Sequence, residues 1–408
     1  MLKFVDDICE LKFDHDTSIV MIPILSDAKL HRQENRISFI YIHDINTNIN
    51  YVISCNHNDA TKHGLDWLNA IKLPKRIYTY TSNILRQYGI TAIDISMYNW
   101  LIYNESLEIK YSNDIEVYHN WYYKYKNVND SIPIVNFIPF CENIVEITKR
   151  LIKVNIPDKI LYFYNNVVLN NYYEIENYGI PTNSELLNQI HNKTGSVIYS
   201  EYNPYTATGR PSNRFGGINF AALNKENGER AIINVQSPEE LLIDFDYDSY
   251  HVKLVAQLIG YELPDVNLHE YFGRMYFDKS ELTDEEYNES KQLTFQLLYG
   301  TMQEEFTSIE FFKKIYEFRK SQWKFWNEHG YIELPNTSRR IYKFNFNSMT
   351  ENKLFNYLIQ SHETDVNNCM LRKILQYLYD KRSKLILYTY DSFYSFIIPK
   401  MERHSSMI

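Results

Sequence analysis

The stretch LIDFDYDSYHVKLVA, residues 242–256, places three aspartates in an apolar, strand-like run. Asp244, Asp246 and Asp248 alternate with large apolar residues, and an amphipathic, helix-like run follows at once. A carboxylate in a buried strand is unfavourable unless a cation or hydrogen-bond donors compensate for its lost hydration. The pattern therefore raises the question of which cation this strand serves.

A second apolar run, LILYTYD, residues 385–391, also ends in an aspartate, Asp391. Two such strands side by side would bring Asp246 and Asp391 close together, and like charges tolerate this around a multivalent cation. Two carboxylates that share two Mg²⁺ ions are the arrangement of in-line phosphoryl transfer. The alternative is that each aspartate only forms a strand-end turn or caps a helix.

The segment KQLTFQLLYG, residues 291–300, has a pattern that suits a nucleotide. On a helix Lys291, Phe295 and Tyr299 lie at i, i+4 and i+8 and share one face. The lysine could meet a triphosphate and the ring could stack under a base. The alternative is a core stripe with a lysine whose stem lies along apolar surface.

Composition limits the class of protein. The chain has 408 residues, of which 44% are hydrophobic and 23% charged, so we expect a globular protein of more than one domain. No apolar run is as long as a membrane span, the N-terminus does not resemble a signal peptide, and the four cysteines are scattered. We therefore expect a cytoplasmic protein without a zinc ribbon. The net charge of −9 does not favour nucleic-acid binding, but a local basic groove would suffice.

Hydrophobic periodicity predicts the main elements. We expect strands at 19–24, 37–43, 50–54 and 76–81 with a helix at 56–71, and a helical stretch at 142–176 that breaks at Pro157. A strand-turn-strand pattern follows at 196–202 and 229–246, then a helix at 251–259 that stops at Gly260. The chain is helical after 266, with a hairpin at 331–344, a long helix at 350–381 and a last strand at 384–398.

A polar loop at 206–224 completes an ordered set of motifs. Thr208-Gly209-Arg210 followed by Pro211-Ser212 resembles the TGR-x-S signature of family A DNA polymerases, the polymerase I-like enzymes. Residues 242–256 then resemble motif A of that family, 291–300 resemble motif B, and YTYDSF, 388–393, resembles motif C. The set covers about residues 170–395, and it resembles that of a divergent viral or phage enzyme.

The resemblance implies an α/β (α+β) fold in the form of a polymerase right hand. Residues 1–135 would form an N-terminal RNase H-like, exonuclease-like domain, and 136–190 a reduced helical thumb. Palm, fingers and palm again would follow at 191–265, 266–335 and 336–408. Since the chain stops soon after Asp391, we expect an incomplete C-terminal palm.

The resemblance also implies the roles of individual residues. Asp246, Asp391 and the main-chain carbonyl of Tyr247 would hold two Mg²⁺ ions, for which Mn²⁺ could substitute. Lys291 would contact the triphosphate and act as a catalytic residue at the leaving group. The remaining nucleotide-binding residues would be Phe295, Tyr299, His251 and His269.

Five residues are expected at DNA. Arg210 and Gln360 would donate hydrogen bonds into the minor groove, where all correct base pairs present similar acceptors. Asn356 completes the family's N-x3-Q pair with Gln360. Arg339 and Arg340 are assigned to backbone phosphates, with a solvated charged turn as the alternative.

The sequence departs from the family in several places. His251 stands where motif A has a glutamate that blocks the sugar 2′-hydroxyl, so discrimination against ribonucleotides is an open question. Tyr287 replaces the arginine that precedes the motif B lysine. Tyr390 and Ser392 flank Asp391 in place of histidine and glutamate, and the Asp-Ser pair resembles single-subunit phage RNA polymerases.

The N-terminal region carries no D-x-E on its first strand. Asp27, Asp44, Asp94 and Asp130 form only a scattered acidic set, so we expect an inactive, structural domain.

The sequence thus predicts a template-directed DNA polymerase that extends a primer 3′-hydroxyl by two-metal phosphoryl transfer. Its partners would be primer–template DNA and dNTPs, with no membrane; processivity or replisome proteins are not identified. Two alternatives remain: an impaired or truncated polymerase fragment that keeps DNA binding, and a related RNA-synthesising enzyme.

Overall fold

The computed structural model describes residues 2–27, 30–107, 130, 132–213, 218–220, 223, 227–235, 237, 239–300 and 302–397. The chain forms two compact units, each with helices and strands. The first comprises residues 1–179, 197–205 and 213–218, and the second comprises residues 180–196, 206–212 and 219–408. The five-part division made from the sequence stays a prediction.

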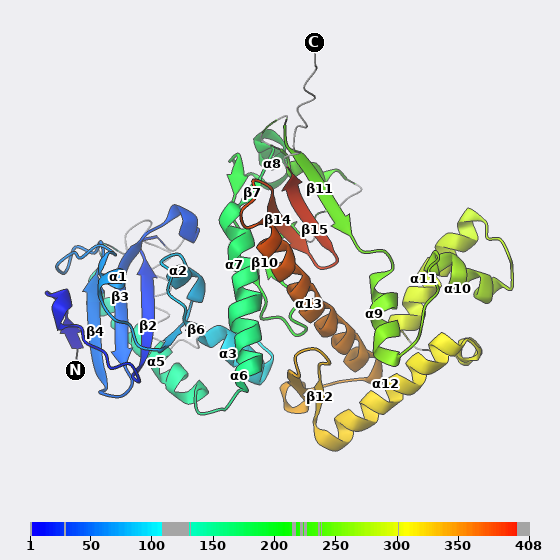
Figure 1. Ribbon diagram of the computed structural model, residues 1–408, viewed down its shortest axis with the longest axis horizontal. Helices are drawn as coiled ribbons and strands as arrows, with labels where there is room; N and C mark the ends of the chain where they lie inside the picture. The colour runs from blue at the N-terminus through cyan, green and yellow to red at the C-terminus, as the bar shows by residue number, and fades with distance from the viewer. Residues whose placement is uncertain are drawn as a thin grey trace, which may run out of the picture. The chain divides into compact units, whose positions relative to one another are not determined.

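The first unit is built on a six-stranded sheet with the order β1-β4-β3-β2-β5-β6 (Figure 1). β3 runs antiparallel to β2 and β4, whereas β2, β5 and β6 run parallel. The strands are Leu2–Phe4 (β1), Ser18–Leu25 (β2), Ile37–Asp44 (β3), Ile49–Ser54 (β4), Arg76–Thr79 (β5) and Ile93–Asp94 (β6). Every residue of β3 is buried, because apolar clusters cover both faces of the sheet. The four strands predicted in this region are confirmed.

Helices flank this sheet within the first unit. They span Trp67–Ala70 (α1), Ser82–Arg86 (α2), Ile95–Tyr103 (α3), Ile138–Leu151 (α5), Asp158–Tyr162 (α6) and Leu169–Tyr178 (α7), with a π-helical turn at Phe163–Val168. The predicted break at Pro157 is confirmed, since this proline directly precedes α6. The predicted helix at 56–71 is wrong: only α1 is helical there, and Gly64 has a φ of +62° that an α-helix cannot contain.

The second unit contains a three-stranded antiparallel sheet with the order β11-β15-β14. Its strands are Leu241–Asp246 (β11), Lys384–Thr389 (β14) and Ser392–Ile397 (β15), and the predicted hairpin is Tyr331–Glu333 (β12) with Arg340–Tyr342 (β13). The short strand Ile180–Pro181 (β7) also belongs to this unit, whereas Val197–Ile198 (β8) and Tyr202–Asn203 (β9) belong to the first unit, and Ser212–Asn213 (β10) has one residue in each.

Two strand predictions are corrected. The single strand expected at 384–398 is a hairpin, because the chain turns at Tyr390, whose φ is +63°. The strand expected from 229 onward begins only at Leu241, and residues 229–232 form a short 3₁₀ helix. The first correction matters most, since it places Asp391 in a turn.

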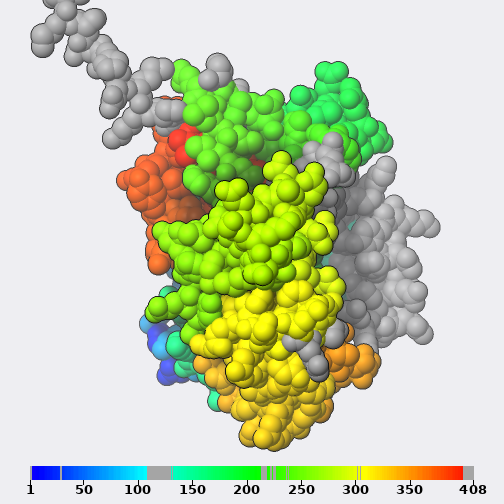
Figure 2. Space-filling model, turned by 90° about the vertical axis from the view of Figure 1, so that its right-hand side faces the viewer, coloured from blue at the N-terminus to red at the C-terminus, as the bar shows by residue number. Residues whose placement is uncertain are grey.

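Helices make up most of the second unit. They span Ser184–His191 (α8), Tyr250–Ile259 (α9), Leu268–Phe277 (α10), Asp284–Tyr299 (α11), Glu310–His329 (α12) and Glu351–Leu378 (α13). α9 ends at Gly260 in the left-handed conformation, as predicted. A buried cluster that includes Val255, Phe272, Leu298, Phe311 and Ile359 joins α9 to α13. Figure 2 shows α10 and α11 in yellow-green lying against α12 in yellow.

Among the described residues, no helix combines the length and the apolar character that crossing a membrane requires.

Candidate active site

The register of the β-sheet brings the backbones of the two predicted metal ligands, Asp246 and Asp391, to one end of the sheet. β11 and β15 pair so that Asp246 lies opposite Ser392, the residue that follows Asp391. The peptide N–H of Tyr247 donates a hydrogen bond to the carbonyl oxygen of Asp391 over 3.3 Å. Opposite residues in an antiparallel pair have Cα atoms about 5 Å apart, so both aspartates lie at the same end of the sheet.

The end of β11 is exposed rather than buried. Asp244, Phe245 and Asp246 are all exposed, so the premise of a buried acidic strand is wrong. Asp244 accepts a hydrogen bond from the Ser392 hydroxyl and lies 3.9 Å from Arg230. Exposure lowers the cost of the negative charge and leaves the Asp246 and Asp391 side chains within reach of a ligand.

The turn at Asp391 is held by contacts that the sequence did not predict. Asn367, buried in α13, donates a hydrogen bond of 2.5 Å to the carbonyl oxygen of Tyr390 and accepts one of 2.6 Å from the Tyr250 hydroxyl. The Tyr250 ring stacks on Tyr247 with centroids 4.2 Å apart. Burial raises the pKa of Tyr250, so its hydroxyl stays a donor. Asn367 therefore links α13 to Tyr390, next to Asp391, and through the Tyr250 ring to Tyr247, next to Asp246.

α11 presents the predicted nucleotide-binding residues. A capping box at Thr283 starts the helix, with Glu286 bonding back to the Thr283 N–H. Lys291 is exposed, and the rings of Phe295 and Tyr299 are nearly parallel, with centroids 6.5 Å apart. The predicted shared face is therefore present.

His269 lies against the same helix. It is buried in α10, and its carbonyl oxygen accepts a 2.6 Å hydrogen bond from the Ser290 hydroxyl. Burial first, and then the nearby charge of Lys291, lower the pKa of His269. The lowered pKa favours a neutral imidazole beside the face of α11 that carries Lys291 and Phe295.

His251 and Arg210 meet at a carboxylate that the sequence analysis missed. The guanidinium of Arg210 donates to Oε2 of Glu363 from Nε over 2.7 Å and from Nη2 over 2.5 Å. His251 Nε2 lies 3.0 Å from Arg210 Nη2 and 3.2 Å from Glu363 Oε1, and His251 Nδ1 is hydrogen bonded to the Tyr299 hydroxyl. The signal was present in the spacing, because Asn356, Gln360 and Glu363 share one face of α13.

The other predicted DNA-binding residues have different surroundings. Asn356 donates to the carbonyl oxygen of Tyr299 over 3.5 Å, and Gln360 is half-buried on the same helix. Arg340 is exposed and pairs with Glu333 over 3.1 Å. Arg339 is only 2% exposed, so neither a phosphate contact nor a solvated turn fits this residue.

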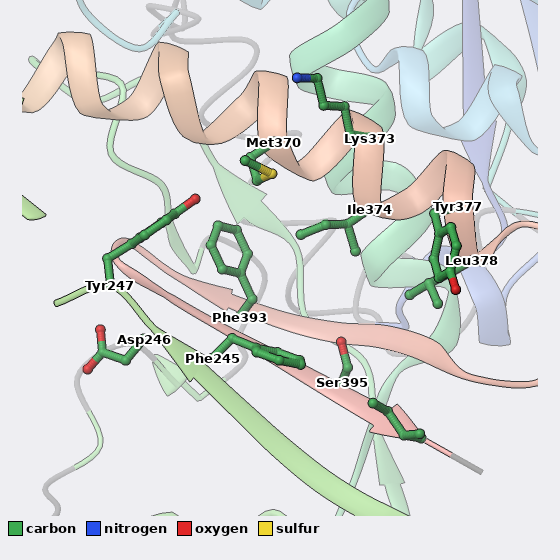
Figure 3. Close-up of a pocket in the computed structure, with 11 residues that line it drawn as sticks. Phe245, Asp246, Tyr247, Met370, Lys373, Ile374, Tyr377, Leu378, Phe393 and Ser395 are labelled. Atoms are coloured by element: carbon green, nitrogen blue, oxygen red, sulfur yellow. The ribbon is translucent and has the colours of Figure 1, made fainter. Parts of the chain in front are cut away.

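A cavity of about 580 Å³ lies between α13 and the sheet. Figure 3 shows Met370, Ile374 and Leu378 of α13 above Phe393 of β15, while the Asp246 carboxylate points away from them. The lining is mostly apolar, and its charged residues are Lys373 and Asp246. Because Asp246 and Tyr247 also line it, the cavity adjoins the candidate active site.

Comparisons with known proteins support the fold. No protein-family model matches the chain, and no curated protein matches it in sequence. Among solved structures, the POL domain of Pol1 from M. smegmatis, in complex with DNA primer-template and dNTP, is similar with a TM-score of 0.64 and 14% sequence identity. The match covers 94% of this chain and 90% of that domain. The chain therefore has a mixed α/β fold that resembles a DNA polymerase domain.

Proposed function

We propose that this protein is a template-directed DNA polymerase that extends a primer 3′-hydroxyl with deoxynucleoside triphosphates. We further propose that it is a divergent family A enzyme of viral or phage type. The observation that carries the proposal is the pairing of β11 with β15, which brings Asp246 and Asp391 to one end of the sheet. The likeness of the fold to a polymerase domain supports it.

The donor set at this end of the sheet fits Mg²⁺. Asp246 and Asp391 offer carboxylate oxygens and Tyr247 offers a carbonyl oxygen, and hard oxygen ligands are those that Mg²⁺ prefers. No group of three or more His, Cys, Asp or Glu side chains suited to a metal forms among the described residues. The remaining ligands would therefore be triphosphate oxygens and water. Two bound ions would lower the pKa of the primer 3′-hydroxyl and neutralise charge on the leaving pyrophosphate.

The chain's own side chains would bind and orient the nucleotide. Lys291 is exposed on α11 and would neutralise the triphosphate as a cation. Phe295, one helical turn further on, is 37% exposed and would stack against the base. Arg210 would donate hydrogen bonds to minor-groove acceptors at the primer end.

The choice of sugar separates this proposal from an RNA-synthesising enzyme. His251 is the observation that favours the alternative, since an imidazole replaces the expected carboxylate beside Tyr299. The TGR-x-S loop at residues 208–212 favours DNA synthesis. Extension with dNTPs and rNTPs in parallel therefore decides between the two.

We propose that the first unit is a structural domain without exonuclease activity. Asp130 pairs with Arg36 over 2.7 Å, and Asp94 caps α3 by accepting from the Ser96 N–H over 2.9 Å. Asp44 accepts from the Asn46 N–H over 2.8 Å in a turn. These carboxylates have structural uses, which supports the proposal. The antiparallel placement of β3 within a parallel sheet is compatible with an exonuclease-like ancestry.

The test is extension of a labelled primer on a DNA template by the full chain with Mg²⁺ or Mn²⁺. Addition of only the templated nucleotide, dependent on the metal, is expected. Tight primer–template binding without extension under either metal would instead identify an impaired polymerase fragment.

A further inference from the structure

Glu363 is the most enclosed charged group at the candidate active site. Its side chain is 1% exposed in the middle of α13. Its Oε2 accepts hydrogen bonds from both Nε and Nη2 of Arg210. This pairing fixes the plane of the guanidinium. The hydrogen bonds of Arg210 within the described part of the chain use Nε and Nη2, and its guanidinium lies over the Tyr390 ring, 5.2 Å from the centroid.

The second oxygen of the same carboxylate faces His251. Glu363 Oε1 lies 3.2 Å from His251 Nε2, which also lies 3.0 Å from Arg210 Nη2. Glu363 Oε1 and the guanidinium of Arg210 thus both lie beside the same ring nitrogen of His251. The other ring nitrogen, Nδ1, is hydrogen bonded to the Tyr299 hydroxyl.

These contacts form one connected network. Glu363 contacts Arg210 through Oε2 and His251 through Oε1, and His251 contacts Tyr299 through Nδ1. We propose that Glu363 is a positioning residue that couples recognition of the primer-terminal base pair by Arg210 to recognition of the nucleotide sugar by His251 and Tyr299. This inference rests on the proposed polymerase function.

A purely structural ion pair is the competing explanation. A buried pair that only stabilises the fold would lower stability when broken but would leave substrate preference unchanged. The ratio of kcat/KM values for dNTP and rNTP therefore separates the two explanations, because this ratio cancels any general loss of active protein.

The experiment measures that ratio for single-nucleotide extension by the full chain. Glu363→Gln keeps the size of the side chain and removes its charge, and should lower the dNTP-to-rNTP ratio by about tenfold, the effect of one lost hydrogen bond. Arg210→Ala should change the ratio in the wild-type background and should have no further effect beside Glu363→Gln. An unchanged ratio in Glu363→Gln, or independent effects of the two substitutions, would overturn the proposal.

Asp365→Asn is the matched control. Asp365 is a buried carboxylate on the same helix and accepts a 2.7 Å hydrogen bond from the Thr337 hydroxyl. Its replacement should lower stability while leaving the sugar ratio at the wild-type value. A shift equal to that of Glu363→Gln would show that any buried substitution in α13 alters the ratio, and would overturn a specific role for Glu363.

Two further measurements distinguish a failure of this inference from a failure of the variant to fold and from a failure of the proposed function. If Glu363→Gln does not fold, the coupling between Arg210→Ala and His251→Ala in the same ratio replaces it, and additive effects overturn the proposal. If the wild type extends no primer with either metal, the proposed function fails. A double-mutant cycle of thermal unfolding for Glu363→Gln and Arg210→Ala then tests the network itself, and an absence of coupling shows that it does not form.

Discussion

The peptide N–H of Tyr247 donates a hydrogen bond to the carbonyl oxygen of Asp391 over 3.3 Å. These residues lie far apart in sequence, and the bond continues the β11–β15 ladder into the turn that carries Asp391. It links the backbone next to Asp246 directly to the backbone of Asp391.

Removal of either carboxylate should abolish primer extension. Asp246→Ala and Asp391→Ala each delete an oxygen ligand of the expected metal pair, and we expect a loss of about a thousandfold or more in kcat. Primer–template binding, measured by fluorescence anisotropy, should stay near the wild-type value. Asp248→Ala is the control, because that carboxylate is exposed and pairs only weakly with Lys253 over 3.4 Å. Full activity of both active-site variants would refute the metal assignment.

His251 should act as a gate for the sugar. Because its ring touches Tyr299 and Arg210, His251→Ala removes both packing and a hydrogen bond beside the expected nucleotide. Ribonucleotide incorporation relative to deoxyribonucleotide should rise by about tenfold to 150-fold. Single-nucleotide extension with dNTP and rNTP in parallel measures this ratio. If the ratio stays constant while activity is retained, His251 is not the gate.

The purified chain should not degrade single-stranded primer. The carboxylates of Asp44, Asp94 and Asp130 serve turns, a helix cap and an ion pair, so we expect no Mg²⁺-dependent 3′–5′ nuclease activity. A gel assay with 5′-labelled primer checks this. Degradation that persists through purification and disappears in Asp94→Asn would contradict it, provided that this variant remains folded.

Acid should destabilise the first unit through His31. This side chain is 2% exposed, and burial, followed by the charge of Arg32, lowers the pKa of His31 to about 3. The unfolded chain has the ordinary pKa near 6.5 and binds a proton first, so the contribution of His31 to stability is present above pH 6.5 and is lost as pH falls toward 3. Between pH 6.5 and 5 the loss is about 2 kcal/mol.

The measurement compares denaturant unfolding of wild type and His31→Gln at pH 7 and pH 5. The variant should lose less stability than the wild type on acidification. His15→Gln, at an exposed histidine, should behave like the wild type. An equal acid sensitivity of His31→Gln and wild type would show that His31 is protonated as readily in the folded chain.

Strong, continuous patterns were read correctly from the sequence, and local backbone effects were not. The strands around Val20, Phe39 and Val52 could be predicted because long apolar runs suit a sheet that is buried on both faces. The turn at Tyr390 was missed because tyrosine is an unusual residue at positive φ, so nothing marks a hairpin there.

At the candidate site, too, periodic patterns could be predicted from the sequence and tertiary contacts could not. Lys291, Phe295 and Tyr299 could be placed on one face because helical spacing fixes that relation. Glu363 and Asn367 were missed because a polar residue in a helix is usually solvated, and their burial depends on elements distant in sequence. The fold class was therefore accessible from periodicity and motif order, whereas the network that orients Arg210 and His251 required the tertiary structure.

The length of α13 has a consequence for how the second unit unfolds. This single helix packs Leu354 and Leu358 against the β12–β13 hairpin, packs Phe355 and Ile359 against α9 and α12, and carries Met370 beside the sheet. The hairpin, the helices α9 and α12, and the sheet each pack on a different stretch of α13. Detaching any of them therefore exposes part of this helix. We therefore expect cooperative opening, in which the backbone amides at the centre of α13 are among the last of this unit to exchange their hydrogens with deuterated solvent.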